Sequence, residues 1–243
     1  MTFDGRIVGL VPARAGSKGL PGKNLLPYKG VPLVVHAGLV GAEALADGVW
    51  LSTDDLDAAR AWLEHDCGER INRPSFLSTD DASMRDVVMH FAAHLDLSVD
   101  DAICVLYPTY PTRTAQLIRD AVSCFCVHGL HDRPMMGVQK PLTHPYRCVE
   151  IRDKTNLLSV AMGWSSLEDD IVLDRGIARR FGRSEVYRRQ DSPPAWELTC
   201  VVCIIPVSSF PRLDHNLLAP DTYAYEVERH PDIDTAEDLE ALR

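Results

Sequence analysis

The feature that most constrains this chain is an alternation of short apolar runs with longer stretches of helical spacing. Strands separated by helices of ten or more residues are joined by crossovers into a mostly parallel sheet. Right-handed crossovers then place helices on both faces. The predicted strands cover residues 6–12, 48–55, 101–109, 135–139, 199–206 and 222–227, and the predicted helices cover residues 32–46, 56–67, 84–95, 114–127 and 236–243.

This pattern predicts an α/β protein with a doubly wound, mostly parallel, Rossmann-like sheet. Ligands of such sheets bind outside the carboxyl ends of the strands. Polar segments follow three of the predicted strands: AGSKG (15–19), STDD (52–55) and PTYPTR (108–113). We expect these segments to line one crevice.

The alternation stops between about residue 143 and residue 190. We interpret this charged stretch as an excursion that forms a small lid or a dimerisation element. The chain has 243 residues, 46% of them hydrophobic and 25% charged, which suits a globular protein with a sizeable core. We therefore predict a single domain over residues 1–243.

Charge and cysteine content narrow the class of partners. A net charge of −10 argues against a nucleic-acid partner. No apolar run approaches the ~20 residues of a membrane span, and no signal peptide opens the chain, so we expect no membrane partner. Cys200 and Cys203 form a C-x-x-C inside an apolar run, which is more typical of a buried strand than of a zinc or redox site. Reduced cysteines favour a cytoplasmic location.

The loop after the first predicted strand reads VPARAGSKGLPGKN (11–24). Its glycines allow close approach of the backbone and positive φ angles, and cations accompany them: Gly16, Gly19, Gly22, Arg14, Lys18 and Lys23. Backbone N–H groups with fixed cations suit a triphosphate, and they can stabilise pyrophosphate as it leaves. The loop lacks the G-x-x-x-x-G-K-[ST] pattern of a Walker A motif. A solvated basic loop is the alternative, and the position directly after a buried strand argues against it.

Two aspartates near the end of the sequence, Asp232 and Asp234, form a second candidate site. With one residue between them, their side chains point the same way on an extended segment. Carboxylates so placed suit Mg²⁺, which prefers oxygen ligands and substrate phosphates. The alternative is a helix cap, because D-x-D-T-A-E-D before an apolar helix is also good capping sequence. Thr235 or Asp234 alone would satisfy that cap.

The loop motif A-R-x-x-S-K-G-[IL]-x-x-K-N resembles the signature of the acylneuraminate cytidylyltransferases, the CMP-sialic acid synthetases. Further motifs have counterparts in the same order along nearly the whole chain: STDD (52–55), NRPSFLSTDDAS (72–83), YPTYPTR (107–113), HPYR (144–147), RRQDSPP (188–194) and DIDTAEDL (232–239). The resemblance implies a nucleotidyltransferase fold and Mg²⁺-dependent transfer of CMP from CTP to an acidic acceptor, with release of pyrophosphate. It also implies a homodimer in which the excursion reaches the partner subunit.

The resemblance assigns roles to individual residues. On the donor side it implies triphosphate contacts for Arg14, Ser17, Lys18 and Lys23, a nucleotide contact for Asn24, and cytosine contacts for Arg73, Ala82 and Ser83. It further implies acceptor contacts for Tyr107, Arg147 and Arg189, and metal ligation for Asp232 and Asp234. A guanidinium can donate to the O2 and N3 acceptors of cytosine, and its fork also suits an acceptor carboxylate. A surface salt bridge is the alternative for Arg73. No residue stands out as a general base.

The departures from the family pattern fall on the acceptor side. The family has Gln where this chain has Tyr107, and an N-G-[AS]-[IFV]-Y strand where residues 199–203 read TCVVC. Some members have a basic residue where this chain has Glu197. The nucleotide half of the site therefore matches the family, while the acceptor half is altered.

The sequence motifs are compatible with several functions. The acceptor is a sialic acid-like nonulosonic acid or a different acid such as a phosphonate or Kdo. Residues 20–23 read LPGK, which resembles part of the Kdo cytidylyltransferase loop, although the preceding SKG favours the sialic type. A non-catalytic nucleotide-binding relative is the further alternative, against which the retained Arg14, Lys18 and aspartates argue.

Overall fold

The computed structural model describes residues 3–16, 19–143, 149–150, 170–173, 176–180 and 194–242. The chain divides into two compact units, one of residues 1–138 with 198–243 and one of residues 139–197. The predicted excursion at about 143–190 lies within the second unit. Its role as a lid or dimerisation element stays a prediction.

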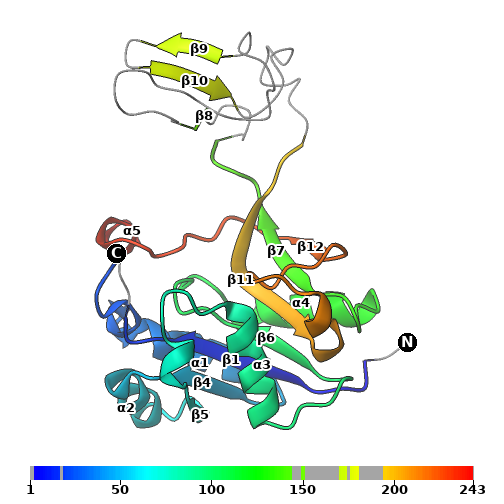
Figure 1. Cartoon of the computed structure of the whole chain (residues 1–243). Coiled ribbons are helices and arrows are strands. Elements are labelled where there is room, and N and C mark those ends of the chain that lie inside the picture. Colours follow the sequence, from blue (N-terminus) through cyan, green and yellow to red (C-terminus); the bar gives the residue numbers. More distant parts are fainter. Residues whose placement is uncertain are drawn as a thin grey trace. The chain divides into compact units, whose positions relative to one another are not determined.

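The first unit is built on a seven-stranded sheet in the order β12-β7-β11-β6-β1-β4-β5 (Figure 1). Its strands are β1 (Ile7–Ala13), β4 (Val49–Thr53), β5 (Glu69–Asn72), β6 (Ala102–Val105), β7 (Met135–Gln139), β11 (Glu197–Pro206) and β12 (Tyr223–Glu226). β1 pairs in parallel with both β4 and β6, and parallel pairing also joins β4 to β5 and β7 to β12. β11 runs antiparallel to β6. The predicted α/β class with a mostly parallel sheet is confirmed.

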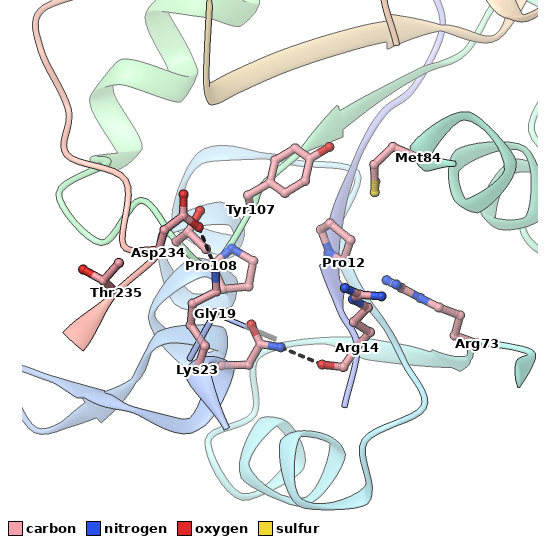
Figure 2. A pocket seen from close by; sticks show the side chains of 12 residues that line it. Pro12, Arg14, Gly19, Lys23, Arg73, Met84, Tyr107, Pro108, Asp234 and Thr235 are labelled. Carbon is pink, nitrogen blue, oxygen red and sulfur yellow. Dashed lines mark hydrogen bonds and ion pairs between the residues drawn. The ribbon is translucent and has the colours of Figure 1, made fainter. Parts of the chain in front are cut away.

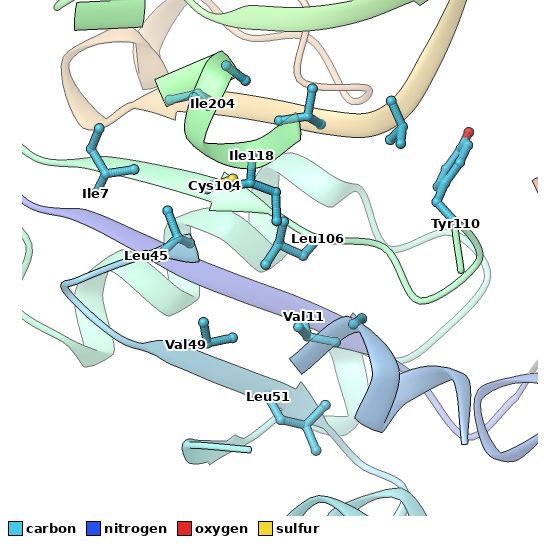
Figure 3. Packing of buried hydrophobic residues seen from close by; sticks show 14 of the residues in the cluster. Ile7, Val11, Leu45, Val49, Leu51, Cys104, Leu106, Tyr110, Ile118 and Ile204 are labelled. Carbon is cyan, nitrogen blue, oxygen red and sulfur yellow. The ribbon is translucent and has the colours of Figure 1, made fainter. Parts of the chain in front are cut away.

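The helices lie on both faces of this sheet: α1 (Leu33–Ala44), α2 (Leu56–Glu64), α3 (Met84–His94), α4 (Ala115–Val127) and the short α5 (Ala236–Glu240). One apolar core joins α1, α2 and α4 to one face, with Val34, Trp62 and Phe125 fully buried. Figure 3 shows part of this core, where Ile118 of α4 packs near Leu106 and Ile204. A second core, which includes Phe91 of α3, covers the opposite face.

Short elements complete the first unit. They are the strands β2 (Pro27–Tyr28) and β3 (Val31–Pro32), which form a hairpin, and the 3₁₀ helices η1 (Lys23–Leu25), η2 (Ser75–Leu77) and η6 (Val207–Arg212). In the described part of the chain, no helix is both long and apolar enough to cross a membrane.

Within the seven-stranded sheet, the structure differs from the sequence prediction most at β5 and β6. β5 was not predicted, because among its four residues only Ile71 is buried. β6 ends at Val105 rather than at Thr109, since the chain turns through a Pro-rich segment where the Arg113 N–H donates to the Tyr110 carbonyl.

In the second unit, the described residues include a three-stranded antiparallel sheet in the order β8-β10-β9. Its strands are β8 (Val149–Glu150), β9 (Asp170–Leu173) and β10 (Gly176–Arg180).

Candidate active site

A pocket of about 490 Å³ opens at the carboxyl ends of β1 and β6 in the first unit. Residues from several distant parts of the sequence line it (Figure 2): Pro12, Arg14, Gly19, Lys23, Asn24, Arg73, Met84, Tyr107, Pro108, Thr109, Asp234 and Thr235. They come from the loop after β1, the residue after β5, the start of α3, the loop after β6 and the segment before α5. The pocket therefore lies where the parallel strands predict a ligand site.

Hydrogen bonds hold the loop after β1 in place around its cations. The buried Asn24 donates from its side-chain amide to the Arg14 carbonyl at 3.1 Å, and the Ala15 N–H donates to the Asp54 carboxylate at 3.0 Å. The Arg14 guanidinium pairs with Asp80 at 2.7 Å. Ser17 and Lys18 lie outside the described residues, so their predicted triphosphate contacts stay predictions.

The structure explains why two positions of this loop are occupied by glycine. Gly22 has a φ of 67° directly before η1, in the left-handed region that favours glycine. A Cβ at Gly19 would come within 3.2 Å of the Asp234 carbonyl oxygen, so the backbones approach closely there. Gly16 shows neither a positive φ nor a close neighbour among the residues that the structure describes.

An ion pair joins this loop to the segment before α5. The Lys23 ammonium lies 2.9 Å from the Asp234 carboxylate, although 211 residues separate them in sequence. The Lys23 side chain is 16% exposed and that of Asp234 is 71% exposed. Figure 2 shows both residues at the pocket wall. The two candidate sites of the sequence are thus parts of one site.

Arg73 brings a buried cation to the same pocket. Its guanidinium donates from Nε and Nη2 to the hydroxyl and carbonyl oxygens of Ser52 at 3.2 and 2.8 Å. The pKa of Arg73 is lowered to about 10, mainly by burial; nearby Arg14 also lowers it, whereas Asp54 raises it. Arg73 is therefore charged at neutral pH. It makes no salt bridge to a described residue, so the salt-bridge alternative for it finds no support.

Ala82 and Ser83 do not line this pocket. Ala82 contributes instead to a separate hollow with Phe76, Met89 and His90. The Ser83 side chain caps α3 by accepting from the Asp86 N–H, and its hydroxyl donates to the Asp86 carboxylate at 2.7 Å. Their predicted cytosine contacts remain predictions.

Tyr107 lines the pocket, and a buried arginine that the sequence did not single out supports it. The Arg113 guanidinium donates to the carbonyl oxygens of Tyr107 and Val201 at 3.0 and 3.1 Å, which ties the loop after β6 to β11. Burial lowers the pKa of Arg113 to about 10. Among the described residues, the Arg113 Nε has no hydrogen-bond partner. The basic residue in an otherwise apolar and hydroxyl-rich run was the signal that could have identified it.

Asp232 lies beside the loop after β6 rather than in the pocket lining. Desolvation by the surrounding protein raises its pKa, although hydrogen bonds from Thr109 and Tyr110 act in the opposite sense. The Asp232 side chain still keeps an exposed surface. Ile233 is buried between the two aspartates, and its N–H donates to the Thr109 carbonyl at 2.9 Å.

Thr235, rather than Asp232 or Asp234, caps α5. The Thr235 side chain accepts from the Asp238 N–H, and Asp238 accepts in return from the Thr235 N–H. Neither the Asp232 nor the Asp234 carboxylate is needed as the cap. Both fit the oxygen-donor chemistry of a magnesium ion. Within the described residues, no group of three or more His, Cys, Asp and Glu side chains is placed to hold a metal, so phosphate and water oxygens would complete its ligand set.

Three further predictions concern Arg147, Arg189 and the C-x-x-C. Arg147 and Arg189 lie outside the described residues, so their acceptor contacts stay predictions. Cys203 is buried and Cys200 is half-buried, both on β11, as the strand reading of the C-x-x-C predicts.

Comparison with known proteins shows which family this chain resembles. The family model described as cytidylyltransferase matches residues 8–124, which include the loop after β1, Arg73 and the loop after β6. Residues 8–124 are therefore similar to the cytidylyltransferases. The resemblance to the acylneuraminate members is confirmed by an N-acylneuraminate cytidylyltransferase of Streptococcus agalactiae, which is 26% identical over 95% of this chain. The chain spans about half of that relative, 51% of its length.

Solved structures share the fold of this chain. CMP:2-keto-3-deoxy-manno-octonic acid synthetase, solved in complex with CTP, has a TM-score of 0.65 at 18% identity, over 98% of this chain and 96% of the other. A Mycobacterium tuberculosis protein solved in complex with manganese has a TM-score of 0.50 at 17% identity, over 98% and 97% of the two chains. At these identities the likeness establishes the nucleotidyltransferase fold.

Proposed function

We propose that this chain transfers CMP from CTP to an acidic sugar and releases pyrophosphate. The observation that carries the proposal is the meeting of Arg14, Lys23 and Arg73 with Asp234 in one pocket at the carboxyl edge of the sheet. Cations grouped in this way can neutralise a triphosphate and a departing pyrophosphate. The match of residues 8–124 to the cytidylyltransferase model and the predicted contacts of Lys18 support the same donor.

In the proposed reaction the acceptor oxygen attacks the α-phosphorus, and the bond between the α- and β-phosphates breaks in line. Arg14 and Lys23 bind phosphate oxygens and hold the charge that moves to pyrophosphate. Arg73 donates to the cytosine edge through the guanidinium nitrogen that Ser52 does not occupy. We assign no general base among the described residues.

Asp232 and Asp234 would hold a divalent metal, which we propose to be Mg²⁺. When bound, such an ion supplies positive charge at the α-phosphate. The Lys23–Asp234 ion pair is exposed enough to exchange, because an exposed ion pair is worth only about 0–1 kcal/mol. Lys23 can therefore turn toward phosphate when Asp234 takes up another cation.

The acceptor we propose is a sialic acid-like nonulosonic acid. The N-acylneuraminate relative, which matches 95% of this chain, supports it. Kdo is the second candidate, because the Kdo-type synthetase shares the fold over nearly the whole chain and residues 20–23 read LPGK. Arg147 and Arg189 are the residues we expect to bind the acceptor carboxylate.

A pyrophosphate-release assay tests this function. CTP, UTP, ATP and GTP are each offered with N-acetylneuraminate, other nonulosonic acids, Kdo and simple phosphonates, in the presence of Mg²⁺ or Mn²⁺. We expect release with CTP and a nonulosonic acid. CTP binding without release from any acceptor would favour the non-catalytic alternative, and equal release from ATP would contradict the cytidine assignment.

We also propose a homodimer in which the second unit, residues 139–197, contacts the partner subunit. Sedimentation velocity of the full chain tests it, and a monomer at micromolar concentration would contradict it. The cytoplasmic location rests on the cysteines and stays a proposal.

A further inference from the structure

Asp80 lies on the loop between η2 and α3, and its carboxylate holds the side chain of Arg14. The Arg14 Nη2 is 2.7 Å from the Asp80 Oδ1, which is the length of a strong charge-assisted hydrogen bond. Arg14 lines the pocket, whereas Asp80 does not. The contact therefore ties a pocket cation to a carboxylate that lies behind the pocket wall.

The backbone next to Arg14 is already fixed by other contacts. Arg14 follows directly after β1, and its carbonyl accepts from the Asn24 side-chain amide at 3.1 Å. The N–H of the same peptide unit, which belongs to Ala15, donates to the Asp54 carboxylate at 3.0 Å. What remains free is the long Arg14 side chain, whose many rotamers make it costly to order. The contact with Asp80 removes much of that freedom.

Arg14 also shares the pocket with a second guanidinium, that of Arg73. Figure 2 shows both side chains on one side of the pocket. Arg73 donates to the neutral oxygens of Ser52, whereas Arg14 is paired with the Asp80 carboxylate. Like charges at close range repel each other, and the Arg14 side chain is 31% exposed, so it could turn toward solvent. The Asp80 carboxylate opposes that movement.

The pairing with Asp80 leaves Arg14 able to bind an anion. A guanidinium carries five N–H donors in a planar fork, and the contact with Asp80 is made by one of its three nitrogens. Arg14 can therefore keep Asp80 and bind phosphate oxygens at the same time. In this respect it differs from Lys23, whose ammonium is a point charge and whose partner Asp234 is largely exposed.

We infer that Asp80 is a positioning residue that holds the Arg14 guanidinium beside Arg73, ready for the phosphates of CTP. The inference rests on the proposed function, because Arg14 binds phosphate only in that proposal. With Asp80 present, the side chain is ordered before the nucleotide arrives, so less free energy is lost on binding. The sequence motifs assign no role to Asp80, although it lies in the segment STDD (78–81).

Calorimetric titration of the full chain with the α,β-methylene analogue of CTP, in EDTA, tests the inference. Asp80→Ala removes the carboxylate, and we expect about fivefold weaker binding of the analogue, because Arg14 must then be ordered on binding. Asp80→Asn, which keeps the size of the side chain, should also weaken it. Affinity for CMP, which lacks the β- and γ-phosphates, should stay close to wild type, and so should the melting temperature.

Asp81→Ala is the matched control. It removes the same charge from the next residue, which is exposed and lines the separate hollow beside Phe76. In an Arg14→Met background, Asp80→Ala should have no further effect, because the pair that it breaks is already absent.

Three results would overturn the inference. The first is an affinity for the analogue in Asp80→Ala that equals or exceeds that of Asp81→Ala. The second is an undiminished effect of Asp80→Ala in the Arg14→Met background. The third is an equal loss of affinity for CMP, which would show general damage to the site. If Arg14→Met itself binds the analogue like wild type, the phosphate role of Arg14 in the proposed function fails instead.

Discussion

The two ends of the central sheet use the same kinds of charged residue for different purposes. At the amino end of β1 and β6, Asp101 is 4% exposed and accepts from the Arg6 N–H, the Arg6 guanidinium and the Ser98 N–H at 2.8, 2.9 and 2.8 Å. At the carboxyl end, Lys23 and Asp234 share one contact, and Asp234 is largely exposed.

The difference lies in burial and in the number of partners. A buried carboxylate with three donors has no room for a ligand, and its hydrogen bonds contribute to stability. An exposed pair with one contact contributes little to stability, so its partners can be exchanged for substrate and metal. We therefore expect substitutions at the carboxyl end to change activity and substitutions at the amino end to change stability.

The largest effect expected is on activity. Lys23→Ala should lower kcat/KM for pyrophosphate release by about 10²–10³-fold, since it removes a cation that holds phosphate charge in the transition state. The melting temperature should move little, because the lost ion pair is exposed at Asp234. Lys29→Ala, an exposed lysine of the same region outside the pocket lining, is the matched control. Equal activity of the two variants would remove Lys23 from the phosphate site.

A smaller loss of substrate affinity is expected at the buried cation. Arg73→Lys should raise KM for CTP by about tenfold, because an ammonium cannot hold both Ser52 oxygens and still present a planar fork to cytosine. Arg70→Lys changes an exposed arginine on β5, three residues before Arg73, and serves as control. A KM that stays at the wild-type value would show that Arg73 does not contact the nucleotide.

At the opposite end, Asp101→Asn should lower the free energy of unfolding by about 2 kcal/mol at pH 7, with kcat/KM unchanged. Burial opposes ionisation of Asp101, but the hydrogen bonds from Arg6 and Ser98 prevail and lower its pKa to about 2. A carboxylate with a depressed folded pKa stabilises the protein above its unfolded value, 3.8, and this contribution is lost as pH falls toward 2.

The pH dependence separates this contribution from packing. Urea unfolding of wild type and Asp101→Asn should differ fully above about pH 5 and converge as pH decreases toward 2. A difference that persists at pH 2 would point to a packing defect at this position.

The smallest effect is expected at Thr235, which caps α5 and lines the pocket beside Asp234. Thr235→Ala should cost about 1 kcal/mol of stability, with a less than tenfold loss of activity, because Asp234 keeps its ion pair with Lys23. Thr235→Ser keeps the capping hydroxyl and should behave like wild type. A hundredfold loss of activity in Thr235→Ala would show that Thr235 itself acts on the substrate.

The sequence by itself determined the layers of the fold and the donor side of the site. Apolar runs alternating with helical spacing report local burial, so the main strands and helices could be placed within a few residues. Arg14, Lys23 and Asn24 could be predicted as pocket residues because their motif is local and its glycines and charges have few other uses. Arg73, which also lines the pocket, came from a second local motif, and the resemblance of both motifs to the family pattern extended the prediction to CTP.

Only the tertiary structure decided which of these groups meet. The Lys23–Asp234 pair spans 211 residues, and the side chains of Arg113 and Tyr110 find hydrogen-bond partners on β11, about 90 residues further along the chain. Ala82 lies in a different hollow from Arg73 despite its place in the same motif. Hydrogen bonds of this kind depend on the directions of side chains that folding brings together, and residue type and spacing do not encode those directions.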